Sequence, residues 1–341
     1  MKYAVLLGKG RYPDELTGFL KEDGPRKDFI EVARRLDADV ISYTSAAARR
    51  GGWFKRLFAS RPLWGAAVEM ALRISPYRRV YVTGEDIGFR LGLLLRARGC
   101  SDRLVTLVHN LTPAKAKVLR RIGHKPFAMF VTVCASQRQA LIDAGVPAEK
   151  TLNVFLSVDD EYFSPREAPR SAEFMACGAE NRDYPTLQQA VRTVEGEVMV
   201  FGHGFFGADT AGGAVTEAPP PNFKLMPRVS FEELRQYYAG AKAIVIPLND
   251  VPYAAGTTGF IEAVCMGKPA IVTRSTGMED YLSADPGFVI APGDPVAMAD
   301  AMRAALVSPD LAEIGARNRA WAVANCGLNG YVEKMVAAMR A

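Results

Sequence analysis

Short apolar, β-branched runs alternate with helical stretches along most of the chain, and this alternation restricts the possible folds more than any other feature. In the first half the strand-like runs are YAVLLG, DVISY, RVYVT, RLVTLV, MFVTV and TLNVF, and helices are expected around residues 26–36, 62–74, 88–98, 113–121 and 136–144. Strands that alternate with helices in this way indicate βαβ units and a parallel sheet. The first half is therefore expected to form a doubly wound α/β domain.

A second alternation follows the polar, proline-containing stretch at 157–172, which we interpret as a linker. Its strand-like runs are EFMACG, EVMVFG, NFKLM, KAIVIPL, PAIVT and GFVIA, and its helices are expected near 183–193, 230–239, 257–266, 294–306, 309–324 and 327–340. The prediction is two Rossmann-like, doubly wound parallel-sheet domains, 1–160 and 161–325, facing a cleft. Residues 326–341 are expected to form a helix that returns to the first domain. In such sheets ligands bind beyond the carboxyl ends of the strands.

The composition argues against several classes of protein. A hydrophobic content of 49% and a charged content of 23% are ordinary for a soluble globular protein. No apolar run reaches the roughly 18 residues that a membrane span needs, and we interpret MKYAVLLGKGRYP as a first strand rather than a signal peptide. The five cysteines form no CxxC pair, which favours a reduced, cytoplasmic setting and argues against a metal site.

The charge is unevenly distributed between the two halves. Residues 1–160 hold 27 Lys and Arg against 16 Asp and Glu, a net charge of +11, whereas residues 161–341 hold 15 against 21, a net charge of −6. A basic half suggests an anionic partner, such as phosphates, a membrane surface or nucleic acid. We expect no nucleic acid, because no nucleic-acid-binding motif is present. The alternative is uneven decoration of the surface.

The stretch YAAGTTGFIEAVCMGKPAIVT at 253–273 is the most specific motif. Gly256, Thr257 and Thr258 precede an apolar helical run that contains one carboxylate, Glu262. The start of a helix offers unpaired N–H groups and the positive end of the helix dipole, and it is a place where phosphate binds. Ordinary threonine capping is the alternative, but a glutamate inside an apolar helix seldom lacks a partner.

Other literal matches are weaker. GHGFFG at 202–207 follows a strand, but the following ADTAGGAVTEAPPP does not open the helix that a dinucleotide-binding fingerprint requires. DAD at 37–39 stands at the entry to a strand, where aspartate commonly turns the chain. An NAD(P)-dependent oxidoreductase or epimerase therefore remains only as an alternative from another class.

Five segments, spread over nearly the whole chain, carry a resemblance to a known family. They are SVDDEYFSP, ASQRQALIDAGVPAEKTLNVFLSVD, CGAENRDYPTLQQAV, VSFEELRQYYAGAKAIVIP and AAGTTGFIEAVCMGKPAIVT. They resemble, in turn, the interdomain segment, the last N-domain segment, the first C-domain strand and helix, the segment that lines the base pocket, and the donor-site signature of the GT-B glycosyltransferases. Among these enzymes the chain is most similar to the retaining group known as family 4.

The resemblance implies a nucleotide-sugar donor, with UDP favoured as the nucleotide, and no required metal. Carried over residue by residue, Glu262 would bind the ribose hydroxyls, the amides of Gly256, Thr257 and Thr258 would hold the diphosphate, and Arg182 would be its cationic partner. His109 matches the N-domain histidine beside the donor sugar, with a locally bonded strand-end histidine as the alternative. Gly8, Lys9 and Gly10 match a loop that closes over the phosphates.

The chain departs from the family pattern at three points. Ala254 stands where the family usually has the first glutamate of a Glu-x7-Glu pair, and Asp250 is close enough in sequence to replace it. Gly178-Ala179 replaces the usual Gly-Arg, and Asp183-Tyr184 replaces the usual Lys-Gly. These changes affect the expected choice of sugar more than that of the nucleotide, and they keep a non-catalytic sugar-nucleotide binder as an alternative.

Residues 45–64, SAAARRGGWFKRLFASRPLW, indicate where an acceptor would be found. On a helix, Trp53, Phe54, Leu57 and Phe58 fall on one side, with basic residues beside them, and this is typical of an interfacial membrane helix. The residues expected to contact membrane or acceptor are Arg49, Arg50, Trp53, Phe54, Lys55 and Arg56. The alternative is that these aromatic residues pack on the N-domain sheet.

The sequence therefore predicts a retaining glycosyltransferase that moves a sugar from a UDP-sugar to an acceptor hydroxyl. The expected acceptor is a membrane lipid, such as diacylglycerol or a polyprenyl-linked sugar, and the expected location is the cytoplasmic face of an anionic membrane, as a peripheral protein. The alternative within the class is a soluble glycosyltransferase acting on a small molecule or a polysaccharide.

Overall fold

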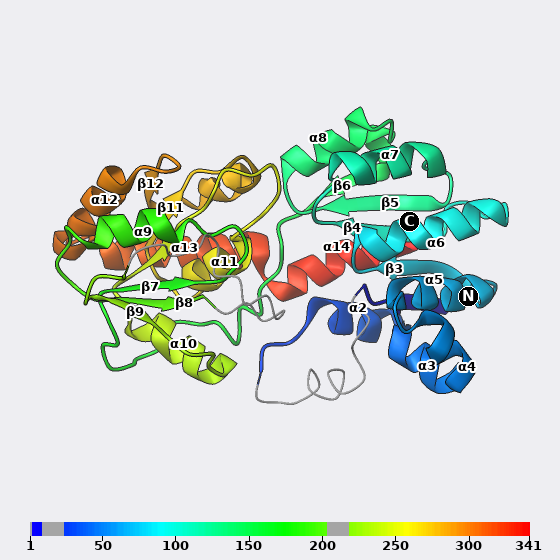
Figure 1. The fold of residues 1–341 in the computed structure, drawn as a ribbon, viewed down its shortest axis with the longest axis horizontal. Coiled ribbons are helices and arrows are strands. Elements are labelled where there is room, and N and C mark those ends of the chain that lie inside the picture. The colour runs from blue at the N-terminus through cyan, green and yellow to red at the C-terminus, as the bar shows by residue number, and fades with distance from the viewer. Residues whose placement is uncertain (1, 9–23, 203–217) are drawn as a thin grey trace. The chain divides into compact units, whose positions relative to one another are not determined.

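The computed structural model describes residues 2–8, 24–202 and 218–341, which form two compact units (Figure 1). Unit 1 contains the first strand, Arg26–Val154 and Asn329–Ala341, and unit 2 contains Phe155–Leu328. The division at Val154 falls before the expected boundary at 160, because Phe155 already packs against Tyr281 and Trp321 of unit 2. Within the described ranges, no helix combines the length and apolar character that a membrane span requires.

Unit 1 is built on a six-stranded parallel sheet. Its strands are β1 (Lys2–Leu6), β2 (Asp39–Ile41), β3 (Tyr77–Val82), β4 (Leu104–Val108), β5 (Phe127–Thr132) and β6 (Thr151–Asn153), in the order β2-β1-β3-β4-β5-β6. All five residues of β4 are buried, as expected for a central strand of a parallel sheet that is covered on both faces. The order reverses at β1, so β1 and β3 form the switch point of this sheet.

The helices of unit 1 cover both faces of that sheet. They are α2 (Asp28–Leu36), α3 (Tyr43–Arg50), α4 (Gly52–Phe58), α5 (Pro62–Leu72), α6 (Glu85–Ala97), α7 (Pro113–Ile122), α8 (Ala135–Asp143), η1 (Ala148–Lys150) and α14 (Leu328–Arg340). Right-handed crossovers place α2 on the face opposite α5 and α6. The C-terminal helix α14 packs within unit 1: Arg35 of α2 pairs with Glu333 at 2.6 Å, and Arg79 donates to the carbonyl of Ala338 at 2.8 Å.

Unit 2 repeats the architecture with a second six-stranded parallel sheet. Its elements are β7 (Phe174–Cys177), α9 (Tyr184–Val191), β8 (Val198–Phe201), β9 (Phe223–Leu225), α10 (Phe231–Gly240), β10 (Ala243–Ile246), α11 (Thr257–Cys265), β11 (Ala270–Thr273), η2 (Thr276–Ala284), β12 (Gly287–Ile290), α12 (Pro295–Val307) and α13 (Leu311–Cys326). The strand order β12-β11-β10-β7-β8-β9 places the switch point between β7 and β10. Helices α9 and α12 pack together, as do α11 and α13.

The two doubly wound parallel sheets confirm the predicted fold class. The short η2 helix was not expected, and the segment 45–64 is not one helix. Gly51, at a φ of +85°, divides that segment into α3 and α4, and this break determines which of its side chains are exposed.

Candidate functional site

The switch point of the unit 2 sheet brings two loops together at the carboxyl ends of β7 and β10. The amide of Asp183, after β7, donates to the carbonyl of Pro247, after β10, at 3.0 Å. The amide of Asn249 donates to the carbonyl of Asn181 at 3.1 Å. Arg182 and Leu248 form an isolated antiparallel bridge between these contacts. The two loops are therefore fixed to each other at the place where open α/β sheets bind ligands.

Helix α11 begins at this junction and presents unpaired donors. Its N-cap, Gly256, has a φ of +83°, and a Cβ there would lie 2.6 Å from Leu248, so only glycine fits. The hydroxyl of Thr257 donates to the carbonyl of Ala254 at 2.8 Å. Among the described residues, the N–H groups of Thr257, Thr258 and Gly259 find no acceptor. These amides and the helix dipole give the start of α11 the donors and the positive potential that an anion requires.

Arg182 adds a buried cation beside these amides. Its side chain is 4% exposed, and it donates from Nε to the carbonyl of Cys177 at 3.0 Å and from Nη1 to that of Glu180 at 2.9 Å. A Cβ on Gly256 would lie 3.3 Å from its Nη1. In the described ranges Arg182 bonds only carbonyl groups, and no carboxylate pairs with it. A buried guanidinium next to a helix N-terminus is costly unless an anion joins it.

Glu262 lies in the second turn of α11, where its side chain is 8% exposed. Its Oε2 accepts a hydrogen bond from the hydroxyl of Tyr238, on α10, at 3.0 Å. Burial raises the pKa of Tyr238 well above its ordinary value, so the phenol stays protonated and can donate. Tyr238 therefore fixes the orientation of the Glu262 carboxylate, a role that the spacing of residues in the sequence does not reveal.

The position of the missing first glutamate is occupied by the half-buried Ala254. Asp250, which we considered as its replacement, accepts a hydrogen bond from the amide of Thr276 through Oδ1 at 2.7 Å. That bond lowers the pKa of Asp250. The Asp250 carboxylate is therefore ionised and already engaged at the start of η2.

His109 follows β4 at the carboxyl edge of the unit 1 sheet, and its side chain is exposed. Its amide donates to Oε2 of Glu85 at 3.0 Å, and the ammonium of Lys115 lies 2.6 Å from Oε1 of the same carboxylate. Burial alone would raise the pKa of Glu85, but these two donors hold it below its usual range. Glu85 thus positions the backbone at His109.

Gly8 lies at the same edge of unit 1, at the switch point. Its amide donates to the hydroxyl of Thr83, after β3, at 2.8 Å. Lys9 and Gly10 lie outside the described residues, as does 203–207 of the GHGFFG match. Among the residues that are described, no group of three His, Cys, Asp or Glu side chains could hold a metal ion.

The basic segment of unit 1 is arranged differently from the single amphipathic helix that we expected. Trp53 and Leu57 of α4 are 61% and 62% exposed, and Lys55 and Arg56 are exposed between them. Phe54 is 1% exposed and stacks on Tyr43, so the expectation that it contacts membrane or acceptor is corrected. The reason is the break at Gly51, which turns α4 so that Phe54 faces the interior.

Arg49 and Arg50 also have a role that the sequence did not indicate. Glu69 of α5 is fully buried, and its carboxylate lies 2.6 Å from Nη2 of Arg49 and 2.7 Å from Nε of Arg50. Both guanidinium groups are therefore committed to an internal ion pair that joins α3 to α5. The signal available in the sequence was Glu69, a single carboxylate within the apolar run PLWGAAVEMAL.

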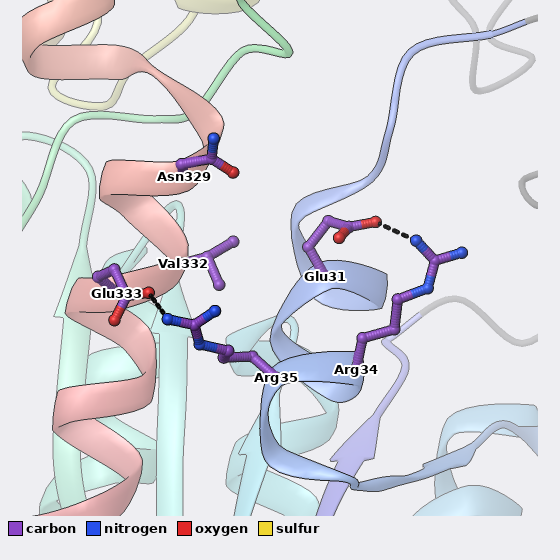
Figure 2. A pocket seen from close by; sticks show the side chains of 6 residues that line it. All are labelled: Glu31, Arg34, Arg35, Asn329, Val332 and Glu333. Atoms are coloured by element: carbon purple, nitrogen blue, oxygen red, sulfur yellow. Dashed lines mark hydrogen bonds and ion pairs between the residues drawn. The ribbon is translucent and has the colours of Figure 1, made fainter.

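A cavity of about 420 Å³ lies between α2 and α14 in unit 1 (Figure 2). The charged groups at its wall pair with one another, Arg34 with Glu31 at 2.8 Å and Arg35 with Glu333 at 2.6 Å. Because these groups pair with one another, the cavity has no uncompensated charge. The start of α11, with the unpaired charge of Arg182 beside it, is therefore the stronger candidate site.

Comparison with known proteins finds one family match and several solved structures with a similar fold. Residues 187–308 match the family described as glycosyl transferases group 1. The fold is similar to Anabaena HepE in complex with UDP-glucose (TM-score 0.72, 15% identity, covering 99% of this chain and 98% of that one). It is also similar to sucrose-phosphate synthase from Thermosynechococcus elongatus (0.71, 14%, 100% and 98%) and to an α,α-trehalose 6-phosphate synthase from Burkholderia multivorans (0.66, 12%, 100% and 98%).

The two-domain fold is similar to that of the GT-B glycosyltransferases, as the resemblance drawn from the sequence predicted, and the similarity to glycosyl transferases group 1 covers residues 187–308. No curated protein matches the sequence. The matched segment contains α11, the start of which holds the unpaired amides, and it ends within unit 2.

Proposed function

We propose that the protein is a glycosyltransferase that moves a sugar from a nucleotide-sugar to an acceptor hydroxyl, with UDP as the favoured nucleotide. The observation that carries this proposal is the buried Arg182 guanidinium, which has no carboxylate partner in the described ranges and lies beside the unpaired amides of α11. This arrangement has the charge and the donors that a diphosphate requires. The similarity to HepE, which was solved with UDP and with UDP-glucose, supports the choice of nucleotide.

Transfer in this site would follow from stabilisation of the leaving group. The bond between the sugar C1 and the diphosphate oxygen breaks, and C1 bonds to the acceptor oxygen with retention of configuration. The departing phosphate oxygen takes the acceptor proton, so no protein base is assigned. Arg182 and the α11 amides would hold the charge that develops on the diphosphate, and such preorganised donors are usually the largest catalytic term.

The remaining residues would act on the two ends of the donor. Glu262, oriented by Tyr238, would accept hydrogen bonds from the ribose hydroxyls. His109, on the backbone that Glu85 positions, remains the residue that the family resemblance assigns to the donor sugar. Asp250 would remain at the start of η2, where it accepts from Thr276, rather than replace the missing glutamate. No step in this proposal requires a metal ion.

Replacement of Glu262 with alanine should weaken UDP binding by about 10- to 100-fold, because a hydrogen bond to a charged group is worth about 1.5–3 kcal/mol. Titration calorimetry with UDP measures this change. Glu195→Ala is the matched control, since Glu195 is exposed and lies before β8, at the opposite edge of the same sheet. Unchanged UDP affinity in Glu262→Ala would remove the ribose contact, and a wild type that binds no nucleotide would remove the proposed function itself.

The proposed acceptor is a membrane lipid, and α4 is the proposed contact with an anionic leaflet. Its exposed Trp53 and Leu57 flank Lys55 and Arg56, so apolar and basic groups share one short helix. Soluble acceptors, either a small molecule or a polysaccharide, are the alternative. Under that alternative the exposed side chains of α4 contact only solvent.

Vesicle flotation separates the two kinds of acceptor. Wild-type protein should float with anionic vesicles at moderate salt and much less with neutral ones, because each basic residue near an anionic surface contributes about 1 kcal/mol. A Trp53→Ser, Leu57→Ser variant should lose flotation, whereas Val307→Ser, which alters an 81% exposed side chain of unit 2, should retain it. If wild type does not float, the search for an acceptor moves to soluble compounds.

A further inference from the structure

A second polar cluster lies beside the phosphate site and takes no part in the mechanism above. It consists of Glu180 and Asn181, after β7, and Tyr253, in the loop before α11. The Tyr253 hydroxyl donates to Oε1 of Glu180 at 3.2 Å, and Nδ2 of Asn181 donates to the Tyr253 oxygen. Glu180 is exposed, while Asn181 and Tyr253 are half-buried. Three hydrogen-bonding side chains therefore meet at the rim of the site.

The cluster is attached directly to the groups that would hold the diphosphate. The carbonyl of Glu180 accepts from Arg182 Nη1 at 2.9 Å, so the two residues share one turn of chain. Tyr253 stands three residues before Gly256, where the unpaired amides of α11 begin. The cluster therefore adjoins, on both loops, the groups that would hold the diphosphate.

Backbone packing holds the cluster in place. A Cβ on Gly277 would lie 1.9 Å from the carbonyl oxygen of Tyr253, so η2 approaches that residue as closely as glycine allows. Asn181 adopts a left-handed φ of +49°, and its carbonyl accepts from the amide of Asn249. Binding groups on a rigid backbone select a ligand without first losing conformational entropy.

The charge states suit the recognition of hydroxyls. Burial first, and then the neighbouring Glu180 carboxylate, raise the pKa of Tyr253 to about 12, so the phenol keeps its proton at neutral pH. Glu180 is exposed and accepts only one hydrogen bond from the described residues, through Oε1. Its Oε2 and the remaining lone pairs are available to hydroxyl donors, because a carboxylate accepts about four hydrogen bonds.

We propose that Glu180, Asn181 and Tyr253 bind the hydroxyls of the donor sugar and select neutral sugars over acidic ones. This inference rests on the proposed function and deepens it by naming the class of donor. The carboxylate accepts from neighbouring hydroxyls of an uncharged pyranose, and it repels the carboxylate of a uronic acid. It supplies, from the loop after β7, the acidic group that Ala254 does not provide.

The test compares UDP, UDP-glucose and UDP-glucuronic acid by titration calorimetry. Wild-type protein should bind UDP-glucose at least about 10-fold more tightly than UDP-glucuronic acid, because like charges in a binding site are strongly unfavourable. Glu180→Gln keeps the shape and removes the charge, so this ratio should fall to about threefold or less. UDP alone should bind both proteins equally, since the phosphate and ribose contacts are unchanged.

Two controls distinguish recognition from a structural role. Tyr253→Phe removes the hydroxyl that donates to Glu180. It should weaken the binding of UDP-glucose without weakening the binding of UDP. Glu195→Gln alters an exposed glutamate at the opposite edge of the sheet and should leave the affinities for UDP and for both UDP-sugars unchanged.

Each contrary result overturns a defined part of the argument. The sugar-binding role is overturned if Glu180→Gln keeps the wild-type ratio of UDP-glucose affinity to UDP-glucuronic acid affinity. It is also overturned if a variant loses as much affinity for UDP as for UDP-glucose. Both results leave the proposed function intact. A wild type that binds neither UDP nor a UDP-sugar overturns both.

Discussion

Arg182→Ala should lower sugar transfer by about 10²–10³-fold, the loss typical of removing one donor from a site where negative charge develops. Arg182 is the buried cation nearest the unpaired amides of α11, and no described carboxylate competes for it. Because its role is in the transition state, kcat should fall more than UDP affinity does. Initial rates of UDP release, with whichever UDP-sugar the wild type consumes, measure this effect.

The same side chain also bonds the carbonyls of Cys177 and Glu180, so its loss must be separated from local unfolding. UDP affinity and the urea midpoint should be measured on the same preparation. Arg317→Ala, which alters an exposed arginine on α13, is the matched control. Wild-type turnover in Arg182→Ala would show that Arg182 only supports the loop after β7.

The double variant Arg49→Ala, Arg50→Ala should destabilise unit 1 by about 3 kcal/mol. Removing both arginines leaves the fully buried Glu69 carboxylate without its partners, and breaking a buried ion pair from one side costs about 3–5 kcal/mol. We expect the lower end of that range, because both arginines are partly exposed. Urea unfolding, followed by hydrogen exchange in peptides from α3 to α5, measures the loss and locates it.

Two further variants test that explanation. Lys55→Ala, Arg56→Ala removes the same charge from the neighbouring α4 and should change the free energy of unfolding by less than about 0.5 kcal/mol. Adding Glu69→Gln to the Arg49, Arg50 double variant should restore part of the lost stability, because the stranded charge disappears. An equal free energy of unfolding in all of these proteins would mean that the ion pair contributes nothing to the stability of unit 1. Because Arg49 and Arg50 neutralise the buried Glu69, the flotation experiment leaves both arginines unchanged.

The strands, most of the helices and the glycine-led start of α11 were predictable because each leaves a local pattern. Period-two and buried β-branched runs mark strands, and a glycine before an apolar helical run marks the start of α11. Arg182 and Glu262 were also singled out from the sequence, and the structure places both residues within unit 2, at or next to the switch point. Their roles toward a ligand stay predictions.

The orientation of α4 was not predictable from the same kind of pattern. Helical periodicity placed Trp53, Phe54 and Leu57 on one face, but the structure separates the buried Phe54 from the other two. Amphipathicity indicates that a face exists without saying which neighbour covers it. Here the break at Gly51 and the contact with Tyr43 decide the matter.

The sequence by itself determined two doubly wound sheets and the place where α11 begins, because these depend on residues close together in the chain. Only the tertiary structure decided the partners of charged and polar groups. Glu69 meets Arg50 across 19 positions, Glu262 meets Tyr238 across 24, and Tyr253 meets Glu180 across 73. Such pairs form where tertiary packing brings separate helices or loops together, and no local periodicity in the sequence records that packing.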